Sequence, residues 1–127
     1  MAKVLVIDDE PDVLMLCRVN LEHAGHDVLV AESGEAGLEL ARNERPDLIV
    51  LDLMMPKMDG WEFRQRQLSD PEFAGIPVLI MSGYPNADKA AGTLGVRTVL
   101  KKPLSVPRLL SLVNRHCTRD ARRASTA

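Results

Sequence analysis

A short apolar run that ends in a carboxylate is the feature that most constrains this chain. Residues 48–51 read Leu-Ile-Val-Leu, Asp52 follows directly, and Pro56 and Gly60 then break the pattern into a loop. Four consecutive apolar residues bounded by turn residues are typical of a strand that is buried on both faces. Such strands belong to parallel sheets that helices cover, so the run predicts an α/β protein with an acid at the end of a central strand.

The rest of the chain alternates between short apolar runs and longer segments with a helical period. The expected strands are residues 3–8, 27–31, 48–51, 78–81 and 97–100, and the expected helices are residues 11–24, 33–43, 61–68, 87–94 and 105–116. Five strand–helix units predict a doubly wound (βα)5 fold with helices on both faces and right-handed crossovers. We expect a five-stranded parallel sheet in the strand order 2-1-3-4-5, which is the flavodoxin-like architecture.

The composition fits one α/β domain and gives no overall attraction to nucleic acid. The chain has 127 residues, of which 46% are hydrophobic and only 3% aromatic, so the core must be aliphatic. Its net charge of −2 and its pI near 5.9 favour neither nucleic acid nor an anionic membrane as a partner. No apolar run is long enough to span a bilayer, and the chain enters its first strand without a signal peptide. We therefore expect a cytoplasmic protein.

The two cysteines and the C-terminal end predict little chemistry. Cys17 and Cys117 have neither a metal-site spacing nor a disulfide pattern, and both fall on apolar helix stripes, so we expect buried free thiols. Residues 1–117 are expected to form the domain, and residues 118–127 a disordered basic tail or linker. The arginines that gather toward this end are Arg108, Arg115, Arg119, Arg122 and Arg123.

Acids follow two of the expected strands at the edge where a ligand would bind. Asp8 and Asp9 follow the first strand, and Asp52 follows the third. The carboxyl ends of these strands are neighbours in a doubly wound sheet, so the three carboxylates should converge. Their repulsion would raise their pKa values unless a cation lies among them, and oxygen ligands suit Mg²⁺ or another hard divalent ion such as Mn²⁺. We assign Asp59 instead to a turn with Gly60 that needs a positive φ angle.

A hydroxyl and an ammonium follow the fourth and fifth strands at the same edge. Ser82 ends the fourth expected strand, and Lys102 follows the fifth and precedes Pro103. These two side chains can bind an anion while the acids hold a cation. A group that is both anionic and bound to a metal ion is most simply a phosphoryl group.

In combination, these motifs resemble the receiver domain of bacterial two-component response regulators, of the CheY-like single-domain type. Each motif alone is weakly specific, but their order on the expected elements is specific, and the resemblance covers residues 3–117. The motifs are Asp8-Asp9, Asp52 followed by Met55-Pro56 and Asp59-Gly60, Ser82, and Lys102-Pro103.

The resemblance implies a role for each side chain at the rim. Asp52 would accept a phosphoryl group from a phosphohistidine or from a small donor such as acetyl phosphate, and Lys102 and Ser82 would contact that group. The Mg²⁺ ligands would be Asp8, Asp9, the Asp52 carboxylate and the backbone carbonyl of Met54. The peptide bond before Pro103 would be cis. A receiver of this kind catalyses only its own phosphorylation and dephosphorylation, and acts as a signalling switch rather than a metabolic enzyme.

The resemblance also implies partners. A sensor histidine kinase or a histidine phosphotransfer protein would donate the phosphoryl group. A downstream output protein would bind the face formed by the fourth helix, the fifth strand and the fifth helix. No direct contact of the receiver with nucleic acid or membrane is expected. Formation of a dimer on phosphorylation is left as an open alternative. Many members carry an aromatic switch residue where this chain has Val99, so that rotamer switch is not expected here. We hypothesise that Tyr84 covers the site and slows hydrolysis.

The sequence also allows other interpretations. The chain could be a receiver excised from a larger regulator or a hybrid kinase, or a receiver-like docking module that works without phosphate. A flavodoxin-like cofactor binder would need a Gly- and hydroxyl-rich loop after the first strand, where this chain has Asp-Asp-Glu-Pro. A phosphohydrolase with an aspartyl nucleophile usually carries a second acid two residues later, where this chain has Met54.

Overall fold

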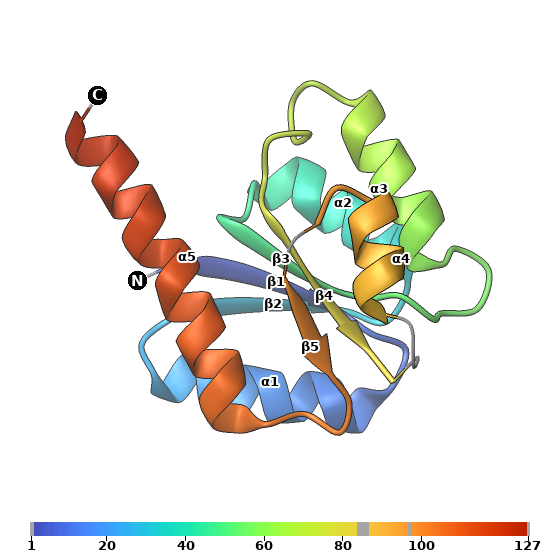
Figure 1. The fold of residues 1–127 in the computed structure, drawn as a ribbon, viewed down its shortest axis with the longest axis horizontal. Helices are drawn as coiled ribbons and strands as arrows, with labels where there is room; N and C mark the ends of the chain where they lie inside the picture. Colours follow the sequence, from blue (N-terminus) through green and yellow to red (C-terminus); the bar gives the residue numbers. More distant parts are fainter. Residues whose placement is uncertain (1, 84–86, 97, 127) are drawn as a thin grey trace.

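The computed structural model describes residues 2–83, 87–96 and 98–126, and side chains as far as His116. Strands and helices alternate along the chain as the sequence predicts (Figure 1). The elements are β1 (Lys3–Ile7), α1 (Pro11–His23), β2 (Asp27–Ala31), α2 (Gly34–Glu44), β3 (Leu48–Asp52), α3 (Gly60–Ser69), β4 (Val78–Ser82), α4 (Ala87–Thr93), β5 (Val99–Lys101) and α5 (Val106–Thr126).

All five strands form one parallel sheet in the order β2-β1-β3-β4-β5, which confirms the predicted topology. The register places Ile7 beside Leu51, and β4 continues the alignment on the other side of β3. At the far edge, Ser82 at the end of β4 lies beside Lys101 at the end of β5. The carboxyl ends of β1, β3, β4 and β5 therefore lie along one edge of the sheet, and the residues that follow them share one space.

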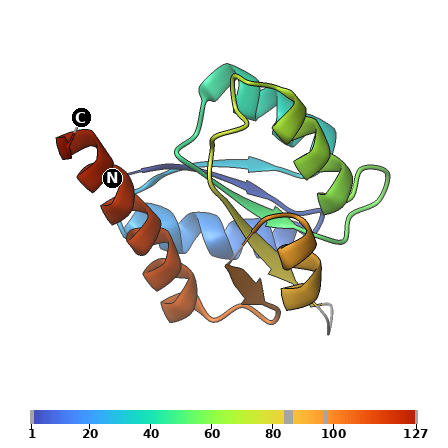
Figure 2. The ribbon, with the colours of Figure 1, turned by 45° about the horizontal axis from the view of Figure 1, so that its top comes forward.

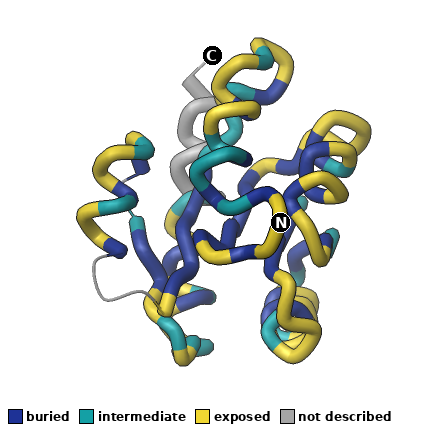
Figure 3. Tube along the Cα trace, turned by 90° about the vertical axis from the view of Figure 1, so that its right-hand side faces the viewer, coloured by how far each residue is buried: buried dark blue, intermediate teal, exposed yellow. Residues whose placement is uncertain are grey.

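Two layers of helices bury the two faces of the sheet (Figure 2). On one face, Leu51 packs with Phe63 in a cluster that also includes residues of α2 and α4. On the other face, Val50 packs with Cys17 of α1 and Leu109 of α5. Buried residues concentrate in the strands and on the inner sides of the helices (Figure 3). Each fully buried aliphatic side chain contributes about 1.5–3 kcal/mol to stability, so this double core fixes the edge of the sheet in place.

Small residues bring α2 close to the site edge. A Cβ atom on Gly37 would overlap the Ile7 side chain of β1, and one on Gly34 would lie 2.8 Å from the Met58 sulfur. Ser33 caps the helix, and its hydroxyl accepts a hydrogen bond from the Ala36 backbone N–H at 3.1 Å. The two glycines allow α2 to lie directly on β1 and on the loop that follows β3.

The loop between β3 and α3 differs from the sequence expectation. Asp59 has a φ angle of −79° and is the N-cap of α3, with its side chain accepting from the Glu62 N–H. Positive φ occurs in this loop at Lys57, at 66°. A Cβ atom on Gly60 would lie 2.8 Å from the Leu53 Cα. The predicted positive-φ turn was therefore wrong: Gly60 is needed for close backbone packing, and Asp59 for helix capping.

The C-terminal half departs from the expected element bounds in two places. The fifth strand begins at Val99, two residues later than predicted, and α5 continues to Thr126, beyond the His116 end predicted from the sequence. Cys17 is buried and free, as expected, whereas the side chain of Cys117 lies outside the described residues. The separation of residues 118–127 from the domain stays a prediction. Across the described part of the chain, none of the helices is both long and apolar enough to cross a membrane.

Candidate functional site

The carboxyl-end edge of the sheet collects the polar side chains that the sequence singles out. Asp8 follows β1, Asp52 ends β3, Ser82 ends β4 and Lys102 follows β5. Asp8, Asp52 and Ser82 are almost completely buried, with 0%, 3% and 1% of their surface exposed. Burying two carboxylates side by side is unfavourable unless positive charge or hydrogen-bond donors compensate. This edge is therefore built for chemistry rather than for packing.

Four carboxylates cluster at this edge. One oxygen from each of Asp8, Asp9, Glu10 and Asp52 lies within 4.8 Å of the others. The sequence predicts the first, second and fourth of these as metal ligands but does not include Glu10. Glu10 is the N-cap by position, yet its side chain makes no capping hydrogen bond. Its place directly after the Asp8-Asp9 pair is the sequence feature that could have identified it.

Lys102 supplies the positive charge at the centre of the cluster. Its Nζ atom lies 2.8 Å from Asp8 Oδ2, 3.1 Å from Glu10 Oε1 and 3.3 Å from Asp52 Oδ2. The neighbouring Lys101 points elsewhere and pairs with Asp88 of α4 at 3.6 Å. The structure thus separates the two adjacent lysines. The peptide bond between Lys102 and Pro103 is cis, as the resemblance implies.

The surroundings shift the pKa values of both Asp52 and Lys102. Burial raises the pKa of Asp52 from 3.8 to about 6; the Asp8 charge raises it further, while Lys102 and the Met54 N–H oppose the rise. Burial lowers the pKa of Lys102, but hydrogen bonds and charges from Asp8, Glu10 and Asp52 outweigh this and bring it above its ordinary value. At neutral pH the site therefore holds a charged ammonium beside a carboxylate that is mostly ionised.

The donor set fits a divalent cation. Asp8 Oδ2 is buried and forms an ion pair with Lys102 Nζ at 2.8 Å. Clustered carboxylate oxygens are the ligands that a hard ion such as Mg²⁺ or Mn²⁺ prefers. Met54 donates its backbone N–H to Asp52 Oδ1 at 3.3 Å. The role predicted for the Met54 carbonyl stays a prediction.

Comparison with known proteins identifies the family. The family model for the response regulator receiver domain matches residues 4–114. The chain belongs to this family. The expected resemblance is thereby confirmed, and receiver domains are signalling switches of two-component systems.

Several relatives share this receiver. Protein PilH of Pseudomonas aeruginosa is 37% identical over 116 residues, which are 90% of this chain and 96% of PilH. The DNA-binding dual master transcriptional regulator RpaA of Synechocystis is 43% identical over 115 residues, but the match spans only 48% of that protein. Among solved structures, the chemotaxis response regulator CheY4 of Vibrio cholerae has a TM-score of 0.83 and 30% identity, over 91% of this chain and 98% of that chain.

Ser82 and Val99, the two residues considered above for switching, lie at the end of β4 and at the start of β5. The backbone N–H of Lys102 donates to the Ser82 carbonyl at 2.9 Å, which joins the hydroxyl-bearing residue to the site lysine through the backbone. Val99 is 8% exposed and packs in the core cluster between the sheet and α2, α3 and α4. Tyr84, the predicted cover of the site, lies outside the described residues.

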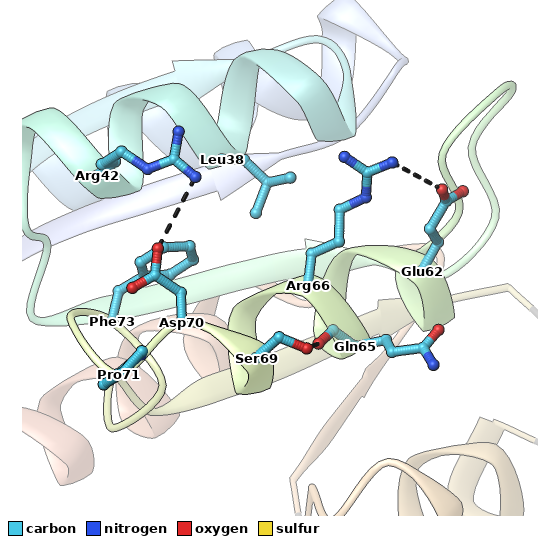
Figure 4. A pocket seen from close by; sticks show the side chains of 9 residues that line it. All are labelled: Leu38, Arg42, Glu62, Gln65, Arg66, Ser69, Asp70, Pro71 and Phe73. Atoms are coloured by element: carbon cyan, nitrogen blue, oxygen red, sulfur yellow. Dashed lines mark hydrogen bonds and ion pairs between the residues drawn. The ribbon is translucent and has the colours of Figure 1, made fainter.

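A separate pocket of about 570 Å³ lies between α2 and α3 and is also lined by residues that follow α3 (Figure 4). Its charged side chains pair with one another: Arg42 with Asp70 at 3.8 Å, and Arg66 with Glu62 at 3.3 Å. Two cations and two acids balance, so the pocket favours neither an anion nor a cation. None of its residues belongs to the carboxylate cluster.

Proposed function

We propose that this receiver takes a phosphoryl group onto Asp52 from a phosphohistidine on a sensor kinase or a histidine phosphotransfer protein. The observation that carries the proposal is the Lys102 ammonium, which contacts Asp52 Oδ2 at 3.3 Å within the carboxylate cluster. The other Asp52 oxygen accepts the Met54 N–H. These two contacts orient the carboxylate, and they support its role as the nucleophile.

The chemistry follows from this arrangement. Asp52 attacks the phosphorus in line, the bond between phosphorus and the donor imidazole breaks, and the imidazole nitrogen keeps that electron pair and takes a proton from solvent. Lys102 stabilises the charge on the phosphoryl oxygens, and Ser82 donates a hydrogen bond to them. A divalent ion held by Asp8, Asp9, Asp52 and the Met54 carbonyl supplies further charge neutralisation when bound. The product is an acyl phosphate that water can hydrolyse, which resets the switch.

We propose that phosphorylation changes the surface formed by α4, β5 and α5. A phosphoryl group adds nearly two negative charges and strong acceptors beside Ser82. Since Ser82 lies in register with Lys101 of β5, a shift of Ser82 toward the phosphoryl group would pass directly into the edge strand. Val99 is small and buried, so the change reaches the partner by movement of the backbone and of α4 rather than by a side-chain flip. A downstream protein would bind this altered face.

Intact mass measurement tests the proposal. After incubation with acetyl phosphate and Mg²⁺, the wild type should gain one phosphoryl group, about 80 Da. Asp52→Asn and a sample with EDTA should show no gain, and Lys102→Met should gain at least tenfold more slowly. Lys101→Met is the matched control and should resemble the wild type. An unmodified wild-type mass under all conditions would favour the alternative of a docking module that works without phosphate.

The domain context of this receiver, its location and its assembly are also proposals. The match to nearly the whole of PilH is compatible with a single-domain regulator, whereas the match to half of RpaA is compatible with a receiver that forms part of a longer regulator. Cytoplasmic location, the lack of direct nucleic-acid or membrane contact, and dimer formation on phosphorylation stay predictions. Size-exclusion chromatography with and without acetyl phosphate would test the last of these.

A further inference from the structure

Glu10 adds a third carboxylate to the site lysine. Its Oε1 atom accepts a hydrogen bond from Lys102 Nζ at 3.1 Å. Asp8 and Asp52 contact the same ammonium from buried positions, whereas the Glu10 side chain is 61% exposed. Although Glu10 is the N-cap of α1 by position, its side chain makes no capping hydrogen bond. The Glu10 carboxylate therefore binds Lys102 and not the helix terminus.

The three carboxylates match the whole donor capacity of Lys102. An ammonium carries three N–H groups and no acceptor. The three acids lie 2.8, 3.1 and 3.3 Å from Lys102 Nζ. A phosphoryl oxygen can therefore bind Lys102 only when one of the carboxylates gives up its contact.

Glu10 is the carboxylate that can be displaced at the lowest cost in free energy. Asp8 is fully buried and Asp52 is the proposed nucleophile, so neither of these carboxylates can turn into water. Glu10 lies at the exposed side of the cluster, where water can solvate its charge after release. Binding of a phosphoryl group then begins with the exchange of Glu10 for a phosphoryl oxygen on Lys102.

The charge of the donor decides how easily this exchange occurs. Acetyl phosphate carries two negative charges near neutral pH and brings no cation of its own. Glu10 therefore repels this donor and at the same time occupies the lysine that would bind it. A protein that presents a phosphohistidine can place a lysine or arginine beside it, and such a cation would pair with the released Glu10.

We propose that Glu10 selects against small, strongly anionic phosphodonors by holding Lys102 in the resting site. The inference rests on the proposed function, because it concerns phosphoryl transfer to Asp52. Glu10 acts through Lys102 and forms no bond to the donor, so it is a positioning residue. The transfer itself is unchanged: Asp52 attacks phosphorus, and the leaving group keeps the electron pair of the bond that breaks.

Initial rates of phosphorylation, measured by intact mass, test the inference. The wild type, Glu10→Gln and Glu10→Lys are compared at Mg²⁺ concentrations that saturate each protein, as established by calorimetry. With acetyl phosphate, the rate should rise at least threefold for Glu10→Gln and further for Glu10→Lys. With phosphoramidate, a small donor that carries one negative charge less, the rise should be at most half as large.

Asp12→Asn is the matched control. Asp12 is an exposed acid in the first turn of α1, and none of the ion pairs between described residues joins it to Lys102. Its replacement removes the same charge from the same helix without releasing the lysine. The phosphorylation rate of this variant should stay within twofold of the wild-type rate with either donor.

Added salt separates an electrostatic role of Glu10 from a packing role. The Debye length falls from about 30 Å at 0.01 M ionic strength to about 3 Å at 1 M, so salt screens the repulsion between Glu10 and an approaching anion. The advantage of Glu10→Gln with acetyl phosphate should therefore shrink as NaCl is raised over this range. A ratio of rates that salt leaves unchanged would contradict the inference.

Three further results would overturn the inference: a wild-type rate for Glu10→Gln, a slower rate at saturating Mg²⁺, or an equal gain with both donors. The slower rate would assign Glu10 to the ion instead. In each case the wild type still gains a phosphoryl group, so the proposed function stands. A lack of any mass gain in all the proteins would remove the proposed function and this inference with it.

Discussion

The protonation of Asp52 links the architecture of the site to the stability of the protein. Asp52 is 3% exposed and lies beside the buried Asp8, so its ionised form is less favourable in the folded chain than in water. Lys102 offsets part of this penalty because it contacts both carboxylates. The site of the resting protein thus contains unfavourable negative charge, which can bind a cation.

Replacement of Asp52 by Asn should stabilise the metal-free protein at neutral pH. The folded-state pKa, about 6, lies above the ordinary value of 3.8, so the folded state binds this proton more tightly than the unfolded state does. The resulting stability is present below pH 4 and is lost as the pH rises through 6. In EDTA at pH 7.5 we expect Asp52→Asn to unfold at higher urea concentration, by on the order of 1–3 kcal/mol.

The same two proteins compared at pH 3 provide the control. There Asp52 is largely protonated in both folded and unfolded states, so the advantage of the Asn variant should shrink toward zero. A variant that is less stable than the wild type at pH 7.5 would mean that the lost ion pair with Lys102 outweighs the relief of buried charge, contrary to this prediction.

At the scale of the elements, α3 holds together the segments that lead into β4 and out of α4. Gln67 is fully buried, and its side-chain amide donates to the backbone carbonyls of Phe73 at 3.0 Å and Ile76 at 2.9 Å. Arg64 donates to the Gln67 side-chain oxygen at 2.8 Å and to the Leu94 carbonyl at 3.2 Å. One helix therefore fixes the loop before β4 and the C-terminal end of α4.

Gln67→Leu should be strongly destabilising. The change removes the donor for two backbone carbonyls, and a buried polar group without a partner costs about 1–3 kcal/mol. We expect the free energy of unfolding in urea to fall by about 2–4 kcal/mol for the pair of carbonyls. Gln65→Leu on the exposed side of the same helix is the matched control and should change stability by less than about 0.5 kcal/mol. Equal effects of the two changes would contradict the role of the network.

Two glycines in different helices should respond to alanine in opposite directions. At Gly60, a Cβ atom would lie 2.8 Å from the Leu53 Cα, so Gly60→Ala must push the start of α3 away from β3 and should cost about 1–3 kcal/mol. At Gly92 in α4 a Cβ atom meets nothing within 4 Å. Gly92→Ala should therefore stabilise the protein by about 0.5–1 kcal/mol through helix propensity. Thermal unfolding of the two variants measures both effects, and a stabilised Gly60→Ala would contradict the packing argument.

At the scale of the whole molecule, the sequence predicts the sheet, its order and most of the site, because each rests on short-range patterns. Apolar runs mark buried strands, and the topology then brings the residues after β1, β3, β4 and β5 to one edge. Asp8, Asp9 and Asp52 converge for that reason. The position of each residue after its strand is sufficient for this prediction, without knowledge of side-chain geometry.

The features that the sequence did not predict depend on contacts between segments. Glu10 joins the carboxylate cluster because Lys102, ninety-two positions later, reaches it. Gly60 is required because its backbone lies close to Leu53. The same close approach decides where α3 begins, and Asp59 caps the helix at that point. Such distances are set by packing of the complete fold, and local propensity contains no information about them.

The reactivity of the buried Cys17 thiol can be used to measure local opening of the fold. The side chain is fully buried between α1 and the sheet, and burial, followed by the charge of Asp8, raises its pKa to about 12. Alkylating reagents attack the thiolate, so Cys17 should react only when α1 lifts from the sheet. In a Cys117→Ser background, the alkylation rate would therefore measure how often α1 separates from the sheet beneath the acidic edge. A ligand that stabilises this edge should lower the alkylation rate.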